Sequence, residues 1–150
     1  MNHFFLGMLS AACAAAGLAV SPASADEHEK PSLVTVLTAA DAQTQLMAMT
    51  LTMQSMQQGA KVRVLLCGSA GDLALKDAPA SATLAQKPAG MSPQGVMKKI
   101  MEAGAPVDVC AIYLPNKDLA ADTLLPGVGQ ARPDVMAGHL IAPNTRILSF

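Results

Sequence analysis

The stretch VDVCAIYLPN, residues 107–116, is the part of the sequence that decides the fold. It predicts a short buried strand over residues 107–113 that carries Cys110 and runs into a loop with Pro115 and Asn116. Two other β-rich runs precede it, at residues 33–37 and 61–66. The first is apolar on both faces apart from Thr35, which favours a strand covered on both sides. We therefore expect one sheet, with the cysteine strand as its third member.

Helical segments separate these strands. Asp41 is a suitable N-cap for a helix that ends near Gly59, and Ser92 followed by Pro93 opens another that ends at Gly104. The stretch 69–88 is irregular, with one short helix expected near residues 72–76. After the cysteine strand we expect a short helix or turn over 117–124, an extended piece over 124–128, a helix over 134–141 and a last strand over 146–150.

The alternation of strands and helices predicts an α/β protein with right-handed crossovers. The expected architecture is a three-layer α/β/α sandwich on a mainly parallel sheet of four to five strands. In such a sheet, ligands and reactive groups lie outside the carboxyl ends of the strands. Cys67 stands at one such end and Cys110 near another.

The amino-terminal segment predicts export. Residues 1–20 are almost wholly apolar, and Ala23-x-Ala25 is a small-x-small cleavage signal ahead of a charged run. We expect a cleaved signal peptide at 1–25, a flexible lead-in at 26–32, a single domain at 33–150, and a periplasmic or secreted product. The alternatives are a membrane anchor and a lipid anchor at Cys13. No later stretch is long and apolar enough to span a bilayer.

The charge pattern excludes nucleic acid as a partner. The net charge is −1, and the sequence has no basic patch of the kind that a phosphate backbone requires.

Two cysteines remain after cleavage, Cys67 and Cys110. An even pair in an exported protein defaults to a disulfide. Helices that begin near Asp41 and Ser92 would place partial positive charge at the same edge and favour a thiolate, the nucleophilic form of cysteine. The alternative is that both are inert core residues, since free cysteine is often buried.

The segment GAPVDVC, residues 104–110, follows an amphipathic helix and resembles the cysteine strand of the DsrE/DsrF-like (TusD-like) sulfur-carrier family. LPGV at 125–128 and TRILSF at 145–150 are similar to that family's closing elements, so the resemblance covers about residues 33–150. It implies an α/β/α sandwich that forms trimers or hexamers. It also implies that Cys110 takes up sulfane sulfur as a persulfide and passes it on, as a sulfur carrier or sulfurtransferase. The donor and acceptor are not specified.

Cys67 is an additional thiol in this comparison. If the first three strands lie side by side in chain order, Cys67 and Cys110 are neighbours within disulfide range. The pair is then a structural bridge, a redox couple, or a persulfide cysteine with its resolving partner.

No motif requires a cofactor, and the alternative to a sulfur carrier is a periplasmic module that binds copper or a small ligand. Thioethers bind Cu(I), but methionines at helical spacing (Met49, Met53, Met56 and Met97, Met101) are better explained as core residues in a chain without Trp. After cleavage His28 becomes the third residue and can complete an amino-terminal Cu(II) or Ni(II) site, against the alternative of a solvated tail. We expect His139 to lie at the surface or a helix end.

Overall fold

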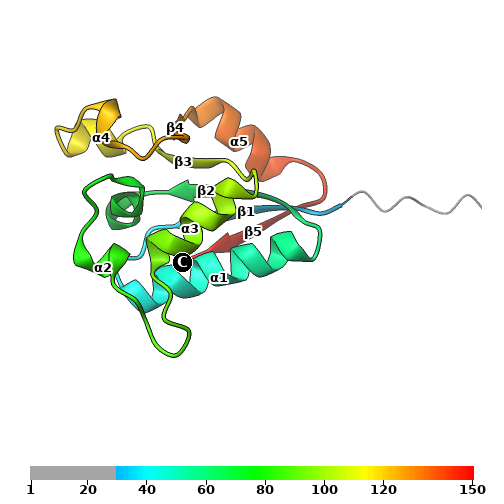
Figure 1. Cartoon of the computed structure of the whole chain (residues 1–150). Helices are drawn as coiled ribbons and strands as arrows, with labels where there is room; N and C mark the ends of the chain where they lie inside the picture. Colours follow the sequence, from blue (N-terminus) through cyan, green and yellow to red (C-terminus); the bar gives the residue numbers. More distant parts are fainter. Residues whose placement is uncertain (1–29) are drawn as a thin grey trace, which may run out of the picture.

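A computed structural model describes residues 30–150 of the protein (Figure 1). The predicted signal peptide at 1–25 and most of the predicted lead-in, including His28, lie outside the described residues. Within residues 30–150, no helix has the length and apolar character needed to cross a membrane.

One parallel sheet organises the described chain. Its strand order is β4-β3-β2-β1-β5, and every neighbouring pair runs parallel. The predicted three-layer α/β/α arrangement on a sheet of four to five strands is confirmed. The strands are β1 (Ser32–Leu37), β2 (Lys61–Leu66), β3 (Val107–Cys110), β4 (Val128–Ala131) and β5 (Thr145–Ser149).

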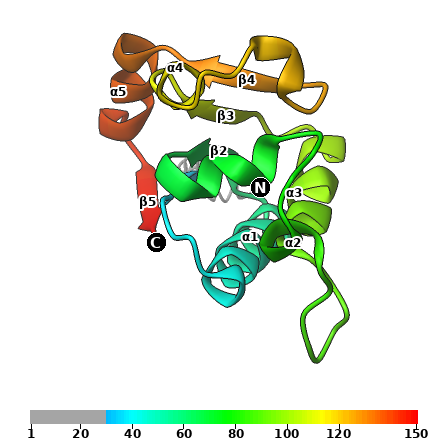
Figure 2. The same ribbon diagram turned by 90° about the vertical axis from the view of Figure 1, so that its left-hand side faces the viewer.

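Helices cover the two faces of the sheet unequally. Figure 2 looks at the carboxyl ends of the strands, with α1, α2 and α3 on one side of the sheet and α5 on the other. The larger core lies under α1 and α3, and the smaller one under α5 contains Val34, Leu65, Ala131 and Met136. The helical elements are α1 (Ala42–Gln57), η1 (Gly68–Ala74), α2 (Ala80–Thr83), α3 (Pro93–Glu102), α4 (Tyr113–Asn116), η2 (Ala121–Thr123) and α5 (Pro133–Ile141).

The two predicted helix caps are confirmed. The Thr44 N–H donates to the Asp41 carboxylate at 2.8 Å, and this bond lowers the pKa of Asp41. The Gly95 N–H donates to Ser92 Oγ at 3.1 Å, and Pro93 opens α3. Each cap therefore begins its helix at the carboxyl edge of the sheet.

The structure corrects two predicted boundaries. The third strand ends at Cys110 rather than at residue 113, because the chain turns into α4, where both Asn116 nitrogens donate to the Ile112 carbonyl. The extended piece predicted at 124–128 is a turn. There the Val128 N–H bonds to the Leu125 carbonyl, and Gly127 takes a positive φ of 88°. The fourth strand, β4, begins only after this turn.

A buried hydroxyl pair joins β1 to α1. Thr35 Oγ1 and Thr52 Oγ1 lie 2.7 Å apart, and Thr52 also donates to the Ala48 carbonyl at 2.7 Å. Both side chains are fully buried. Because each hydroxyl has a single hydrogen, Thr35 must be the donor to Thr52.

Because Thr35 is the donor and Thr52 the acceptor, two similar substitutions should have unequal effects on stability. Thr52→Val leaves the Thr35 hydroxyl without an acceptor and should lower the free energy of unfolding by about 1–3 kcal/mol. Thr35→Val leaves Thr52 bonded to Ala48 and should cost about 1 kcal/mol or less. Adding Thr35→Val to Thr52→Val should restore part of the loss, because no unpaired hydroxyl remains. Urea denaturation of the three variants measures this, and strictly additive losses would contradict it.

Candidate functional site

The two cysteines that the sequence singled out are joined in a disulfide, Cys67–Cys110. Their Cα atoms are 5.1 Å apart, and 43 residues separate them in the chain. Val64 pairs with Val107 and Leu66 with Val109 along β2 and β3, so the cysteines stand at the next position of the same register. The disulfide is therefore a cross-strand link at the carboxyl edge of the sheet.

The disulfide lies on the face of the sheet that α5 covers. Both cysteines pack against the smaller core and are partly exposed. Cys110 pairs with Ala131 of β4, and α5 begins two residues later at Pro133. The start of α5 is thus next to Cys110 in the register. The sequence predicted helix N-termini at this edge only near Asp41 and Ser92. Those two residues cap helices on the opposite face of the sheet.

A cleft of about 500 Å³ opens beside the disulfide. Its lining contains both cysteines and the first residues of the two loops that follow them. The lining is Cys67, Gly68, Ser69, Cys110, Ile112, Tyr113, Asn116 and Lys117. Its volume falls in the range of small-molecule sites, and both cysteines in its lining are partly exposed, so the disulfide lies in a cleft of the size that binds small molecules.

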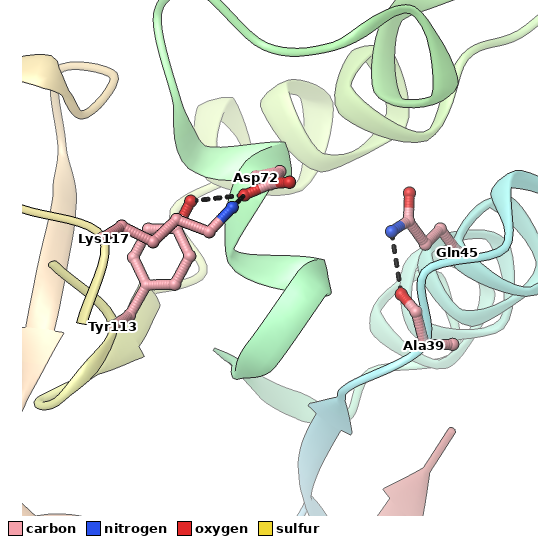
Figure 3. Close-up of polar contacts among 5 residues, drawn as sticks. All are labelled: Ala39, Gln45, Asp72, Tyr113 and Lys117. Atoms are coloured by element: carbon pink, nitrogen blue, oxygen red, sulfur yellow. Dashed lines mark hydrogen bonds and ion pairs between the residues drawn. The ribbon is translucent and has the colours of Figure 1, made fainter. Parts of the chain in front are cut away.

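A polar cluster bridges the same two loops, and we call Asp72, Tyr113 and Lys117 the Asp72 cluster. The Tyr113 hydroxyl donates to Asp72 Oδ1 at 2.7 Å, and Lys117 Nζ forms an ion pair with the same oxygen (Figure 3). Lys117 Nζ also lies 5.5 Å from the centre of the Tyr113 ring. Asp72 belongs to η1, directly after Cys67, whereas Tyr113 and Lys117 follow Cys110.

Burial is the main cause that raises the pKa of Tyr113 above its ordinary value, and the hydrogen bond and negative charge of Asp72 add to it. The phenol therefore keeps its proton and remains a donor to Asp72 wherever cysteine thiols titrate. Figure 3 also shows a separate contact at the start of α1, where Gln45 Nε2 donates to the Ala39 carbonyl at 2.8 Å.

No motif in the sequence indicates a role for the three residues of the Asp72 cluster. One signal was available: Tyr113 is the only tyrosine of the chain and closely follows Cys110. Asp72 could not be found in this way, because it lies in an irregular stretch whose position depends on the tertiary fold.

The methionines at helical spacing are core residues, as predicted. Met49 and Met97 are fully buried, and Met53, Met56 and Met101 pack against the same core. Met47, at 54% exposure, is outside it. His139 lies in the last turn of α5, as predicted. Among residues 30–150 there is no group of three or more His, Cys, Asp or Glu side chains suited to a metal ion.

Solved structures share this fold. The YchN protein of E. coli superposes with a TM-score of 0.64 at 16% sequence identity, covering 81% of this chain and 100% of YchN. MTH1491 of Methanobacterium thermoautotrophicum, a protein of unknown function, superposes with a TM-score of 0.60 at 12% identity, covering 81% of this chain and 100% of its own.

No family model matches the chain. No curated protein sequence matches it either. The parallel sheet and the Cys67–Cys110 disulfide define an α/β protein whose disulfide lies at the carboxyl edge of the sheet. The likeness to YchN, which has a DsrE-like fold, makes the fold of this chain DsrE-like.

Proposed function

We propose that this protein is an exported sulfur carrier that takes up sulfane sulfur on Cys110 and uses Cys67 as the resolving cysteine. The observation that supports it most directly is the Cys67–Cys110 disulfide at the rim of the parallel sheet, partly exposed beside a cleft of about 500 Å³. Reactive groups of parallel sheets occupy this edge. The DsrE-like fold and the resemblance of residues 104–110 to a sulfur-carrier strand support the same assignment.

The reaction begins with reduction of the disulfide by two equivalents of a small thiol, which leave as their own disulfide. The Cys110 thiolate then attacks the outer sulfur of a hydropersulfide, R–S–SH. A bond forms between Cys110 Sγ and that sulfur, the donor's S–S bond breaks, and the donor leaves as the thiolate R–S⁻. The product is a Cys110 persulfide.

Two fates are open to this persulfide. An acceptor thiolate can attack its outer sulfur, which leaves Cys110 as a thiolate and completes the transfer. Alternatively, the Cys67 thiolate attacks Cys110 Sγ, hydrosulfide leaves, and the disulfide forms again. The second route needs the sulfur atoms of the two residues to be in contact, and the cross-strand register brings them together.

Mass spectrometry of protein that has been reduced and then treated with polysulfide tests the carrier role. Every sample carries Cys13→Ser, so that only two thiols remain. We expect added sulfur on Cys110, and we expect it to persist longer in Cys67→Ser because the resolving thiol is absent. Cys110→Ser should carry none. Sulfur found only on Cys67, or equally fast loss from wild type and Cys67→Ser, would reject the assignment.

A structural bridge is the second candidate, and the same disulfide supports it. A bridge with no chemistry should resist physiological thiols, whereas a carrier must be reduced by them. Structural disulfides typically have potentials below about −300 mV. Titration of the oxidised protein with glutathione separates the two candidates: complete resistance favours the bridge, and reversible reduction favours the carrier.

We also propose that the chain associates with copies of itself. Large apolar side chains remain exposed around α5: Val135 and Ile141 on the helix and Ile147 on β5, at 46%, 84% and 56% exposure. Ile147 pairs with Val34, so it shares the face that α5 covers only in part. Light scattering should give a trimer or hexamer for the wild type and a smaller species for Ile147→Glu. A wild-type mass of one chain would exclude association.

A further inference from the structure

The two loops that follow the cysteines are joined twice, once by the disulfide and once by the Asp72 cluster. The hydrogen bonding between β2 and β3 reaches only to the pair Leu66 and Val109. Cys67 and Cys110 lie one position beyond it. Each cysteine is instead fixed on its other side, since the Cys67 N–H donates to the Leu37 carbonyl at 2.9 Å and Cys110 pairs with Ala131. When the disulfide is open, the pairing of β2 with β3 therefore does not itself link Cys67 to Cys110.

We infer that Asp72, Tyr113 and Lys117 are positioning residues that hold the Cys67 and Cys110 thiols within bonding distance while the disulfide is reduced. This inference rests on the proposed function, because it assigns the pair a reduced working state. The cluster is attached to both cysteine loops: η1 starts at Gly68, and α4 starts at Tyr113. It acts through the backbone of these loops and touches no reacting atom.

The strength of the cluster follows from where it lies. Tyr113 is 4% exposed, so its bond to Asp72 is shielded from water on the phenol side. The side chain of Asp72 is 24% exposed and that of Lys117 is 41% exposed. Both contacts end on the charged Asp72 oxygen, but the Lys117 ion pair is weakened by solvent at its exposed end. The Tyr113 bond is therefore the main connection, and the Lys117 ion pair supports it.

A second line of contacts fixes η1 relative to the chain after α4. The Lys76 N–H donates to the Thr123 carbonyl at 2.9 Å, the Leu125 N–H donates to the Ala74 carbonyl at 2.8 Å, and Leu75 forms a bridge with Leu124. None of these contacts depends on the disulfide. The end of η1 can therefore stay docked when the disulfide opens. The Asp72 cluster then holds η1 and α4 together next to the two cysteines.

The measurable consequence is the reduction potential of the cysteine pair. A dithiol whose sulfur atoms are held together closes more readily than one whose loops separate, because less chain entropy is lost on closure. The cluster is formed in the disulfide-bonded protein, and it is lost in those reduced molecules whose loops have separated, so its contacts stabilise the oxidised form more than the reduced form. Removing the cluster should therefore favour the separated dithiol and make the disulfide easier to reduce.

The test is equilibrium of the full chain with dithiothreitol buffers at pH 7, measured by alkylation of free thiols and mass spectrometry. Asp72→Ala should raise the equilibrium constant for reduction about tenfold, equivalent to about 30 mV. Tyr113→Phe, which keeps the ring and loses only the hydroxyl, should shift it in the same direction by a smaller factor. Asp77→Asn is the matched control, because Asp77 is an exposed carboxylate soon after η1, and it should leave the constant unchanged.

The inference is overturned if Asp72→Ala and Tyr113→Phe both have equilibrium constants for reduction within about twofold of the wild-type value. For comparison, a tenfold change corresponds to about 30 mV. If Asp72→Ala does not fold, Tyr113→Phe and Lys117→Met decide. A role in stability alone would lower the unfolding free energy of oxidised and reduced protein equally and leave the constant unchanged.

If the constant shifts but wild type forms no persulfide, the positioning role stands and the carrier function fails. If wild type forms the persulfide and the constant does not shift, the carrier function stands and the positioning role fails.

Discussion

Opening the Cys67–Cys110 disulfide is expected to lower the free energy of unfolding by about 4 kcal/mol. The cysteines are 43 residues apart, so the disulfide closes a long loop in the unfolded chain and removes much of its conformational entropy. A loss of this size is a large fraction of the stability of a small domain. Guanidinium denaturation of oxidised and reduced Cys13→Ser protein measures it directly.

Two controls make the result specific. Oxidised and reduced forms of Cys67→Ala/Cys110→Ala should unfold at the same denaturant concentration, since neither can form the bond. This double variant should also resemble the reduced parent protein. A difference between oxidised and reduced parent below about 1 kcal/mol would contradict the expectation, because the entropy of a loop this long exceeds that value.

Gly71→Ala is expected to be the most damaging single-methyl change in the loop after Cys67. Gly71 is buried in η1, and a Cβ at this position would enter the ring of Tyr113. Tyr113 is 4% exposed and bonded to Asp72, so the ring cannot move without breaking that bond. We expect a loss of about 1–3 kcal/mol or more, the usual range for overpacking a filled core.

Gly138→Ala is the matched control for this substitution. Gly138 lies inside α5, and a Cβ there meets no heavy atom within 4 Å. The same added methyl should stabilise this helix by up to about 1 kcal/mol, since alanine favours helix more than glycine does. Thermal unfolding of the two variants should therefore show shifts of opposite sign. A Gly71→Ala variant as stable as wild type would show that Tyr113 is free to repack.

Several elements could be predicted because local chemistry determines them. Asp41 and Ser92 supply the hydrogen-bond acceptors that exposed helix N–H groups need, so the starts of α1 and α3 were placed correctly. The apolar run at 33–37 favours a strand covered on both faces, and β1 lies inside the sheet. The alternation of these strands with helices then indicated a parallel sheet, whose carboxyl edge holds both cysteines.

The end of the third strand could not be predicted in the same way. Residues 107–113 are all compatible with a strand, yet β3 stops at Cys110, and Tyr113 turns inward toward Asp72. That turn gains a buried ring and a charge-assisted hydrogen bond, and both depend on a loop distant in the sequence. The prediction of an extended piece at 124–128 was wrong for a different reason, since it gave too little weight to Pro126 and Gly127, which favour a turn.

The sequence by itself determined the α/β architecture, the parallel sheet and the edge to which Cys67 and Cys110 belong, because periodicity, caps and chain order are local properties. Only the tertiary structure decided that these cysteines meet in one register, that α5 begins beside them, and that Asp72 joins Tyr113 and Lys117 next to the cleft. These arrangements depend on how irregular segments pack against each other. Such segments have no repeating pattern, so their contacts are set by the shape of the completed core rather than by their own residues.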